Sequence, residues 1–278
     1  MSKIAVIGLV GNSAFLSTDR FHQGGETVVA KDIHFEPGGK GFNQAVAVSR
    51  MGECVSFLGA VGNDYYSTVS DFCQKEKINA TLKIKDGATA YASIITNSSG
   101  DTRVTVFEGV RLTAEDVQDF KEEISSADVL LLNNEVLEEV NVRAVEIAKE
   151  SGTTVILNPA PARELPPFLL ENVDLFTPNE FEASALGDKQ NLIITLGEKG
   201  CFIKEENKTV PAFKMDNVVD TTGAGDTFNG ALAVMLSKKA DVSKAVEVAS
   251  AAAGISVTKK YAVSSIPTKE EIQKLCNF

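Results

Sequence analysis

The chain contains the stretch Asp220-Thr221-Thr222-Gly223-Ala224-Gly225-Asp226-Thr227-Phe228-Asn229-Gly230, in which a turn of small residues runs directly into a helical pattern over 227–236. Because glycine has no Cβ, such a turn lets backbone N–H groups approach an anion closely. The first turn of a helix also leaves N–H groups unpaired and carries the positive end of the helix dipole. Asp226 adds a carboxylate at the same point. An anion hole beside a carboxylate base is the combination that phosphoryl transfer to a hydroxyl group requires.

A second glycine cluster, Pro37-Gly38-Gly39-Lys40-Gly41-Phe42-Asn43-Gln44, opens another helical pattern that continues to residue 51. Its spacing is neither that of a Walker A loop nor that of a dinucleotide-binding fingerprint. Lys40 and Asn43 together offer hydrogen-bond donors and an acceptor at the start of the helix, which suits a ligand with several hydroxyl groups. Taken alone, each cluster would also fit an ordinary glycine turn, with Asp226 as a helix cap.

Composition and charge narrow the class of protein. The chain has 278 residues and a net charge of −11, which disfavours nucleic acid or an anionic membrane as the partner. Its four cysteines are far apart, and neither they nor the two histidines have the spacing of a metal site, which indicates free thiols in a reducing compartment. No apolar run is long enough to span a membrane. We therefore expect a cytoplasmic protein of enzyme size.

Apolar runs alternate with helical patterns along most of the chain. Buried strands are predicted at 4–7, 55–58, 129–132, 154–157, 175–176 and 192–195, and helices at 41–51, 66–75, 114–124, 137–149, 179–186, 225–236, 242–258 and 268–275. Strands that alternate with helices predict βαβ units. The expected fold class is α/β, with a doubly wound, mostly parallel sheet flanked by helices, in one domain over 1–278.

Two regions break this alternation. Residues 26–35 and 90–107 have the period-2 pattern of strands, with a hairpin turn at 97–101, and 203–213 is predicted as a further hairpin. We expect 12–38 and 88–110 to form a small β-sheet lid over the active site. Because a small sheet buries few of its own faces and edges, we also expect the lid to mediate a homodimer.

With both glycine clusters in view, the chain resembles the ribokinase-like (PfkB-type) sugar kinases over essentially its whole length. The motifs that carry the resemblance are Gly-Gly-Lys-Gly-x-Asn at 38–43 and Asp-Thr-x-Gly-Ala-Gly-Asp-x-Phe at 220–228. The segments 158–163, 177–182 and 195–200 agree, and the run Asn-Pro-Ala-Pro-Ala-Arg-Glu-Leu-Pro at 158–166 is most similar to the ribokinase branch. The resemblance implies ATP-dependent phosphorylation of a sugar hydroxymethyl group, with ribose as the first candidate, Mg²⁺ as cofactor and K⁺ as activating cation.

The resemblance also implies roles for individual residues. Asp226 would be the catalytic base, and the backbone amides of Gly223, Ala224 and Gly225 the anion hole. Sugar contacts are implied for Gly39, Lys40, Gly41, Asn43, Glu135 and Asp226. The nucleotide and Mg²⁺ would lie against Asn179, Glu182, Thr195, Gly197, Gly200, Gly225 and Ser250. The monovalent-cation site would comprise Asp220, Thr222, Ser256, Lys259, Tyr261 and Ser265.

Three features depart from the family pattern. Ser13 stands where the family has an aspartate that binds two sugar hydroxyls, and Asn12, Asp19 or a water molecule could take its place. The segment 181–192 is too short for a helix that relatives carry there. Tyr261 replaces a glycine in the cation loop, and a tyrosine adopts positive φ only at a cost, so we expect this loop to differ.

Several alternatives stay open at this point. A nucleoside or another furanose would also suit the acceptor site, and a kinase fold that binds sugar or nucleotide without turnover would fit the loss of the sugar aspartate. Glu135 also fits a helix-start carboxylate, Asn179 a helix N-cap and Ser250 plain helix surface. The retained Asp226, Lys40 and Asn43 favour an active kinase.

Overall fold

The main sheet consists of six parallel strands. The structure is a computed structural model and describes residues 2–278. The strand order is β10-β9-β8-β1-β4-β5, with bounds β1 (Lys3–Ile7), β4 (Cys54–Val61), β5 (Asn79–Ile84), β8 (Val129–Asn133), β9 (Thr154–Asn158) and β10 (Leu175–Phe176). From β1 the chain adds β4 and β5 on one side and β8, β9 and β10 on the other. The order therefore reverses between β1 and β8, and ligands bind at the carboxyl ends of the strands beside such a switch point.

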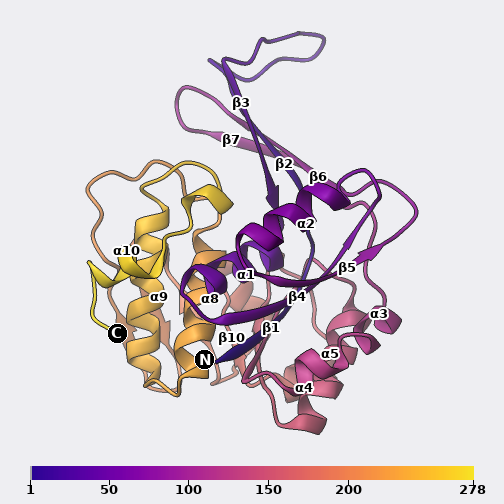
Figure 1. The fold of residues 1–278 in the computed structure, drawn as a ribbon. Helices are drawn as coiled ribbons and strands as arrows, with labels where there is room; N and C mark the ends of the chain where they lie inside the picture. The colour runs from indigo at the N-terminus through magenta and orange to yellow at the C-terminus, as the bar shows by residue number, and fades with distance from the viewer. Residues whose placement is uncertain (1) are drawn as a thin grey trace.

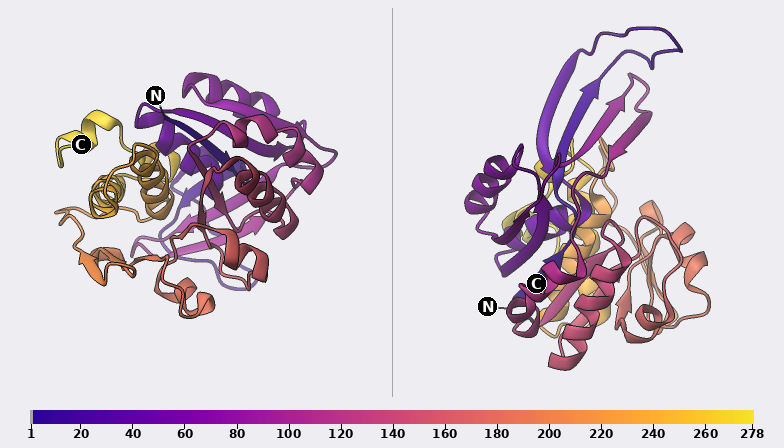
Figure 2. Two further views of the ribbon diagram at one scale, coloured as in Figure 1. Left: turned by 90° about the horizontal axis from the view of Figure 1, so that it is seen from below. Right: turned by 90° about the vertical axis from the view of Figure 1, so that its right-hand side faces the viewer.

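Helices cover both faces of this sheet (Figures 1 and 2), which confirms the doubly wound fold. On β1, Ile4 and Val6 pack into one core cluster and Ala5 and Ile7 into the other, because successive side chains point to opposite faces. The first cluster is covered by α1 (Lys40–Arg50), α2 (Tyr66–Lys75), α8 (Ala224–Ser237), α9 (Val242–Ser256) and α10 (Lys269–Gln273). The second is covered by α3 (Ala114–Gln118), α4 (Lys121–Ser125), α5 (Glu138–Ser151) and α6 (Pro167–Asn172).

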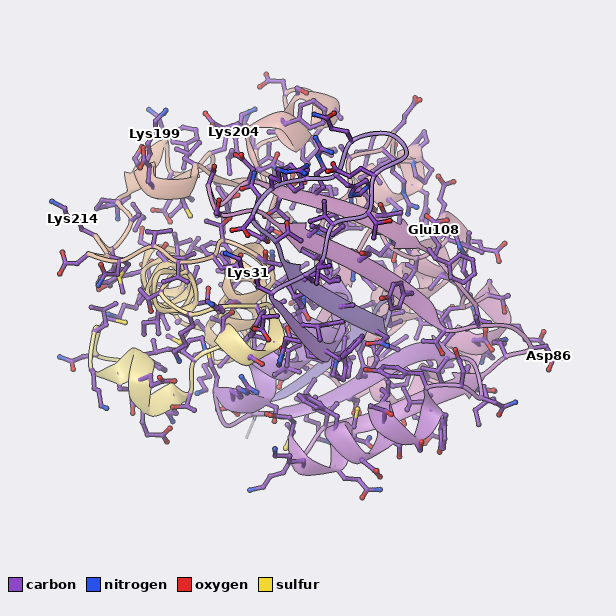
Figure 3. The ribbon with its side chains drawn as sticks, turned by 90° about the horizontal axis from the view of Figure 1, so that it is seen from above. Lys31, Asp86, Glu108, Lys199, Lys204 and Lys214 are labelled. Atoms are coloured by element: carbon purple, nitrogen blue, oxygen red, sulfur yellow. The ribbon has the colours of Figure 1, made fainter. Side chains whose placement is uncertain are left out.

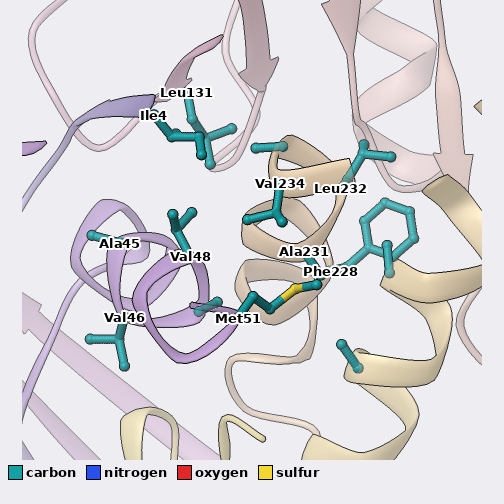
Figure 4. Close-up of a cluster of buried hydrophobic side chains, with 14 of the residues drawn as sticks. Ile4, Ala45, Val46, Val48, Met51, Leu131, Phe228, Ala231, Leu232 and Val234 are labelled. Atoms are coloured by element: carbon teal, nitrogen blue, oxygen red, sulfur yellow. The ribbon is translucent and has the colours of Figure 1, made fainter. Parts of the chain in front are cut away.

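The two helices that follow the glycine clusters pack directly on each other. Figure 4 shows Val48 of α1 and Met51, which caps the end of α1, facing Ala231 and Val234 of α8 beneath Ile4 of β1 and Leu131 of β8. The contact is close because α8 has Gly230 there: a Cβ at this position would lie 2.5 Å from the Ala47 Cβ. This packing fixes the beginnings of α1 and α8 relative to each other, and these are the two ends that carry the predicted site.

A second sheet stands apart from the main one and projects from the molecule (Figure 1; Figure 2, right). Its strand order is β3-β2-β6-β7, with β2 (Gly11–Ser17), β3 (Asp32–Gly38), β6 (Ala90–Thr96) and β7 (Thr102–Phe107). The pair β2–β6 is parallel, while β2–β3 and β6–β7 are antiparallel. We refer to these four strands as the lid, and the C-terminus lies in the body of the molecule, away from the lid.

The predicted strand at 26–35 is wrong in its first half, since β3 begins only at Asp32. Its partner β2 ends at Ser17, so residues 26–31 have no ladder to join. The lid strand β2 and the edge strand β5 were not predicted. The helix expected over 114–124 is divided at Asp119 and Phe120 into α3 and α4.

The remaining elements extend the main sheet beyond β10. Leu192 bridges Phe176, and β11 (Ile193–Thr195), β12 (Cys201–Ile203) and β13 (Lys208–Val210) form an antiparallel sheet that includes the hairpin expected over 203–213. Between β10 and β11 lie only α7 (Glu180–Ala183) and the 3₁₀ turn η1 (Ser184–Leu186), shorter than the helix expected over 179–186. Two more 3₁₀ turns are η2 (Gly197–Lys199) and η3 (Val263–Ser265).

Candidate active site

Asp226 lies in the first turn of α8 and is buried, with 5% of its surface exposed. The Asn43 Nδ2 donates to its Oδ2 at 2.8 Å, and the Gln44 Nε2 lies 3.4 Å from its Oδ1. Burial raises the pKa of Asp226 above its ordinary value, while the positive charge of Lys40 and the two amide donors oppose that rise. The result is a carboxylate of fixed orientation that is more basic than an exposed aspartate, as a general base requires.

The predicted anion hole consists of the backbone amides of Gly223, Ala224 and Gly225, at the beginning of α8. Gly223 caps α8 at φ 77°, a left-handed conformation that favours glycine. Among residues 2–278, the N–H groups of Gly223, Gly225 and Asp226 donate to no other group, whereas that of Ala224 donates to the Thr221 carbonyl at 3.2 Å. Gly225 faces open space, since a Cβ there would meet nothing within 4 Å. Free amides at a helix N-terminus beside an open volume suit an anionic phosphoryl group.

Lys40, the first residue of α1, lies among carboxylates from three other elements. Its backbone N–H donates to the Glu135 Oε2 at 2.6 Å, and the charges of Asp226, Glu135 and Glu182 raise the pKa of its ammonium despite burial. Glu135 follows the carboxyl end of β8, and burial raises its pKa to about 7, although Lys40 opposes the rise. The turn before Lys40 needs glycine: Gly39 has φ 108°, and a Cβ there would lie 2.4 Å from the Leu9 carbonyl oxygen. A Cβ on Gly41 would likewise lie 2.6 Å from the Gly8 Cα.

The strand β2 places Ser13 on the inner face of the lid, buried and opposite Glu36 of β3. Neither residue expected to compensate for the missing aspartate shares that position. Asn12 precedes Ser13 on the same strand, so its side chain is directed to the other face. Asp19 lies beyond the end of β2, largely exposed and paired with Lys31.

The residues implied for the nucleotide lie along the end of β10 and β11. Asn179 and Glu182 cap α7 reciprocally: the Glu182 N–H donates to the Asn179 Oδ1 at 2.8 Å, and the Asn179 N–H donates to the Glu182 Oε2 at 2.9 Å. Asn179 also bridges Thr195, and Gly197 and Gly200 stand at positive φ in the turn that follows. Ser250 of α9 is buried against Cys201, at 3.8 Å between hydroxyl and sulfur.

Three lysines lie on the side of the molecule that carries the turn η2. Viewed from above (Figure 3), the labelled Lys199, Lys204 and Lys214 lie on one side and the labelled Asp86 and Glu108 on the other. Lys199 belongs to the turn η2 between Gly197 and Gly200. Lys204 pairs with Asp188 at 2.9 Å. Lys199 is the lysine beside the glycine turn, where a positive charge favours a polyphosphate.

The predicted cation loop is only partly assembled around Asp220. Its Oδ1 accepts the Thr222 N–H at 2.9 Å and its Oδ2 accepts the Tyr261 N–H at 3.0 Å. The expectation that Tyr261 avoids a glycine conformation is wrong, because Tyr261 has φ 72°. The hydroxyls of Ser256 and Ser265 donate to the carbonyls of Ala253 and Ala262, while the Lys259 ammonium pairs with Glu271.

One contact in this site was missed by sequence reasoning. The Gln44 side-chain amide is directed at Asp226. In the sequence, the only signal for this contact is that Gln44 follows Asn43 at the start of α1. On successive positions of a helix two side chains rarely reach one group, and here the close approach of α1 to α8 permits it.

Taken together, a buried carboxylate, free amides at a helix N-terminus and a lysine–amide cradle at a sheet switch point define a phosphotransferase that acts on a hydroxyl acceptor. Comparison with known proteins agrees with this class: the chain belongs to the pfkB family of carbohydrate kinases, whose pattern matches residues 1–269.

Relatives of the chain extend over its full length. It is 35% identical to the ribokinase of Lactococcus lactis, over 98% of this chain and 96% of that protein. The crystal structure of ribokinase from Thermotoga maritima, 33% identical, superposes with a TM-score of 0.89 over 100% of both chains. The structure of Arabidopsis thaliana ribokinase complexed with ribose and ATP, 25% identical, superposes with a TM-score of 0.87, again over 100% of both chains. The protein is an ATP-dependent sugar kinase. Among residues 2–278, no helix is long and apolar enough to cross a membrane.

Proposed function

We propose that this kinase phosphorylates ribose on its hydroxymethyl group, giving ribose 5-phosphate and ADP. The observation that carries the proposal is the position of the Asp226 carboxylate, buried and held by Asn43 next to the free amides of Gly225 and Asp226 itself. The similarity over the full chain to proteins named ribokinase supports ribose as the acceptor.

In the proposed reaction, Asp226 takes the proton of the sugar hydroxymethyl as its oxygen attacks the terminal phosphorus of ATP. The new bond joins the sugar oxygen to phosphorus, the bond from phosphorus to the bridging oxygen breaks, and ADP leaves with that electron pair. Asn43 and Gln44 hold the carboxylate in place, and the free amides of α8 stabilise the charge on the moving phosphoryl group. In this proposal, Lys40 and Glu135 would hydrogen-bond the other sugar hydroxyls.

Two ions belong to the proposal. Mg²⁺ would be held by Glu182, whose Oε2 accepts the Asn179 amide while its other oxygen has no hydrogen-bond partner among residues 2–278, and would neutralise charge on the nucleotide phosphates. K⁺ would suit the oxygen-rich loop at Asp220, the Thr222 carbonyl, the end of α9 at Ser256 and Lys259, and the loop at Tyr261 and Ser265. For the nucleotide, we propose Thr195, Gly197, Gly200 and Ser250 as neighbours.

A second candidate acceptor has one specific observation in its favour. Ser13 lies on the inner face of the lid, where it offers a neutral hydroxyl and no carboxylate. A site without that charged acceptor discriminates less against a sugar that lacks one hydroxyl, such as 2-deoxyribose, or against another furanose or a nucleoside.

A substrate screen tests the proposal. Purified protein with ATP and Mg²⁺, with and without K⁺, is given ribose, 2-deoxyribose, other pentoses and nucleosides while ADP release and sugar phosphate are followed. Ribose is expected to have the highest kcat/KM. A higher kcat/KM for 2-deoxyribose or a nucleoside would identify that compound, and not ribose, as the acceptor. ATP binding without turnover of any acceptor would contradict the proposal.

A further inference from the structure

Glu36 of β3 links the lid to a segment more than two hundred residues later in the chain. Its carboxylate is buried, with 5% of the residue exposed. The Oε1 accepts the N–H groups of Ala262 and Val263, both at 2.8 Å. The Oε2 accepts the N–H of Ser264 at 3.0 Å and its hydroxyl at 2.6 Å. Three consecutive amides and one hydroxyl therefore converge on one charged side chain, and such charge-assisted hydrogen bonds are the strong ones.

The side chains around Glu36 strengthen the same junction. On the inner face of the lid the His34 ring stacks on Tyr261, with centroids 3.9 Å apart, and the Phe15 ring lies 5.1 Å from it. Phe15, Ile94 and Ala262 form a small core of their own. Tyr261 keeps its positive φ within this stack, with its N–H bound to Asp220. The base of the lid is thus packed as well as hydrogen-bonded to the segment 261–264.

This segment continues to the anion hole. Gly223, the cap of α8, faces it so closely that a Cβ there would lie 3.2 Å from the Ala262 Cα. In the other direction along the chain, Glu36 is followed by the turn 37–39 and then by Lys40. Glu36 therefore stands between the half of the site that holds the sugar and the half that holds the phosphoryl group.

We propose that Glu36 is a positioning residue that fixes the sugar-binding start of α1 against the anion hole at the start of α8. It acts through residues 262–264 and touches neither substrate. In-line transfer depends on the distance between the acceptor oxygen and the phosphorus. A small change in the position of the start of α1 relative to the start of α8 therefore lowers the rate of transfer. The inference rests on the proposed function for its kinetic part only.

The test compares Glu36→Gln and Glu36→Asp with Asp32→Asn, an exposed carboxylate on the same strand and the same face. Glu36→Gln puts an NH₂ group against N–H donors, and we expect kcat/KM for the sugar to fall about 10- to 100-fold, since at least one charge-assisted bond is lost. Sugar-independent ATP hydrolysis should fall less, so the ratio of hydrolysis to phosphorylation rises. Glu36→Asp keeps the charge but has a shorter side chain, so its kcat/KM for the sugar should lie between those of Glu36→Gln and wild type. The kcat/KM of Asp32→Asn should equal that of wild type.

A purely structural role is distinguished by the same measurements. If Glu36→Gln only reduces the folded fraction, kcat falls while the sugar KM and the hydrolysis ratio keep their wild-type values, and the proposal is overturned. Should that variant not fold, Ser264→Ala removes a single donor and must change the KM and the ratio in the same direction for the proposal to stand.

Hydrogen exchange separates this inference from the choice of substrate. In Glu36→Gln, or in Glu36→Asp if that variant does not fold, the amides of 262–264 should exchange at least about tenfold faster than in wild type, because their acceptor is weakened or withdrawn. This readout needs no turnover, so a wild-type protein inactive on every sugar would contradict the proposed function alone. Unchanged exchange at 262–264 would overturn the positioning role.

Discussion

At the scale of single residues, the proposed chemistry depends on one carboxylate, Asp226, whose surroundings have opposite effects on its pKa. Burial makes Asp226 more basic, while Lys40 and Asn43 keep it ionised and oriented. Replacement of Asp226 by Asn keeps the shape and its hydrogen-bonding neighbours but removes the proton acceptor. We expect kcat to fall about 10²- to 10⁴-fold with ATP binding nearly unchanged. Steady-state kinetics and ATP titration measure both, with the exposed Asp119→Asn as control, and a near-wild-type kcat would contradict the assigned base.

The pH dependence should report the same carboxylate. Asp226 works as a base only when ionised, so activity is lost as pH falls through its pKa, which burial raises above the ordinary aspartate value. Asn43 lowers that pKa by donating to the ionised form; Asn43→Ala should therefore move the acid limb of the kcat/KM profile to higher pH. Because Glu135 has a pKa of about 7, the comparison is made in a Glu135→Gln background. An acid limb that stays at the same pH, or that moves to lower pH, would contradict this role of Asn43.

Ser13 is the residue expected to set acceptor discrimination. A carboxylate there would add charge-assisted hydrogen bonds worth about 1.5–3 kcal/mol each to sugar hydroxyls. Ser13→Asp should therefore increase kcat/KM for ribose relative to 2-deoxyribose by about tenfold or more, at some cost in thermal stability because Glu36 stands opposite. Ser13→Asn, of the same shape without the charge, is the control. A tight ribose KM in the unmodified protein that Ser13→Asp leaves unchanged would show that other groups complete the pocket.

At the scale of elements, a substitution at the start of α8 can separate the stability of the helix from the space that we propose for the phosphoryl group. Gly225 lies within the helix and faces open space, so an added methyl group meets no neighbour. Gly225→Ala should stabilise the fold by about 0.5–1 kcal/mol through helix propensity, yet lower kcat because the methyl group projects where the phosphoryl group is expected. Gly254→Ala in α9, whose Cβ would make ordinary contacts with Met215, should stabilise similarly without the loss of kcat. Full activity in Gly225→Ala would move the phosphoryl group away from this turn.

The elements differ in how far sequence predicted them, and the reasons are physical. Strands buried on both faces, such as β1, β8 and β9, are continuous apolar runs and were predicted within a residue or two. The lid strand β2 reads Gly-Asn-Ser-Ala-Phe-Leu-Ser and has neither an apolar run nor a strict alternation, because its burial comes from β3, β6 and residues 261–262. The edge strand β5 is half-buried and partly polar, so its strand conformation depends on pairing with β4 and not on a local sequence pattern.

The same distinction applies to the site. The motifs located Asp226, Lys40, Asn43 and Glu135, which the structure brings together through hydrogen bonds and charge. Glu36 was not found, because it is one carboxylate before a glycine turn and its partners, 262–264, lie 226 or more residues further along the chain. Contacts of that separation leave no local signal in a single sequence. The conformation of Tyr261 was mispredicted for the same reason: local propensity disfavours it, and the stack on His34 outweighs that preference.

At the scale of the whole molecule, the lid presents an outer face that nothing in residues 2–278 covers. Ile33, Phe35, Tyr91 and Phe107 all belong to this face by their strand register, and they are 50%, 54%, 39% and 56% exposed. Figure 1 shows this sheet projecting away from the rest of the molecule. Val104 and Val106, on the inner face of the edge strand β7, are exposed as well, at 57% and 56%. Exposed apolar side chains on a projecting sheet are typical of an interaction surface, and a second copy of the same lid is a self-complementary partner.

We therefore expect a homodimer through the lid, and Phe35→Asp should dissociate it because a charge would be buried at the centre of the contact. Light scattering at micromolar concentration gives the mass of both proteins, and Leu275→Glu, an exposed apolar residue at the far end of the chain, is the control. If the lid is held by its partner, dissociation should also raise the sugar KM more than the ATP KM, since β3 leads into the start of α1, where we propose that the sugar binds. A wild-type monomer, or a Phe35→Asp variant that remains dimeric, would place the interface elsewhere or exclude it.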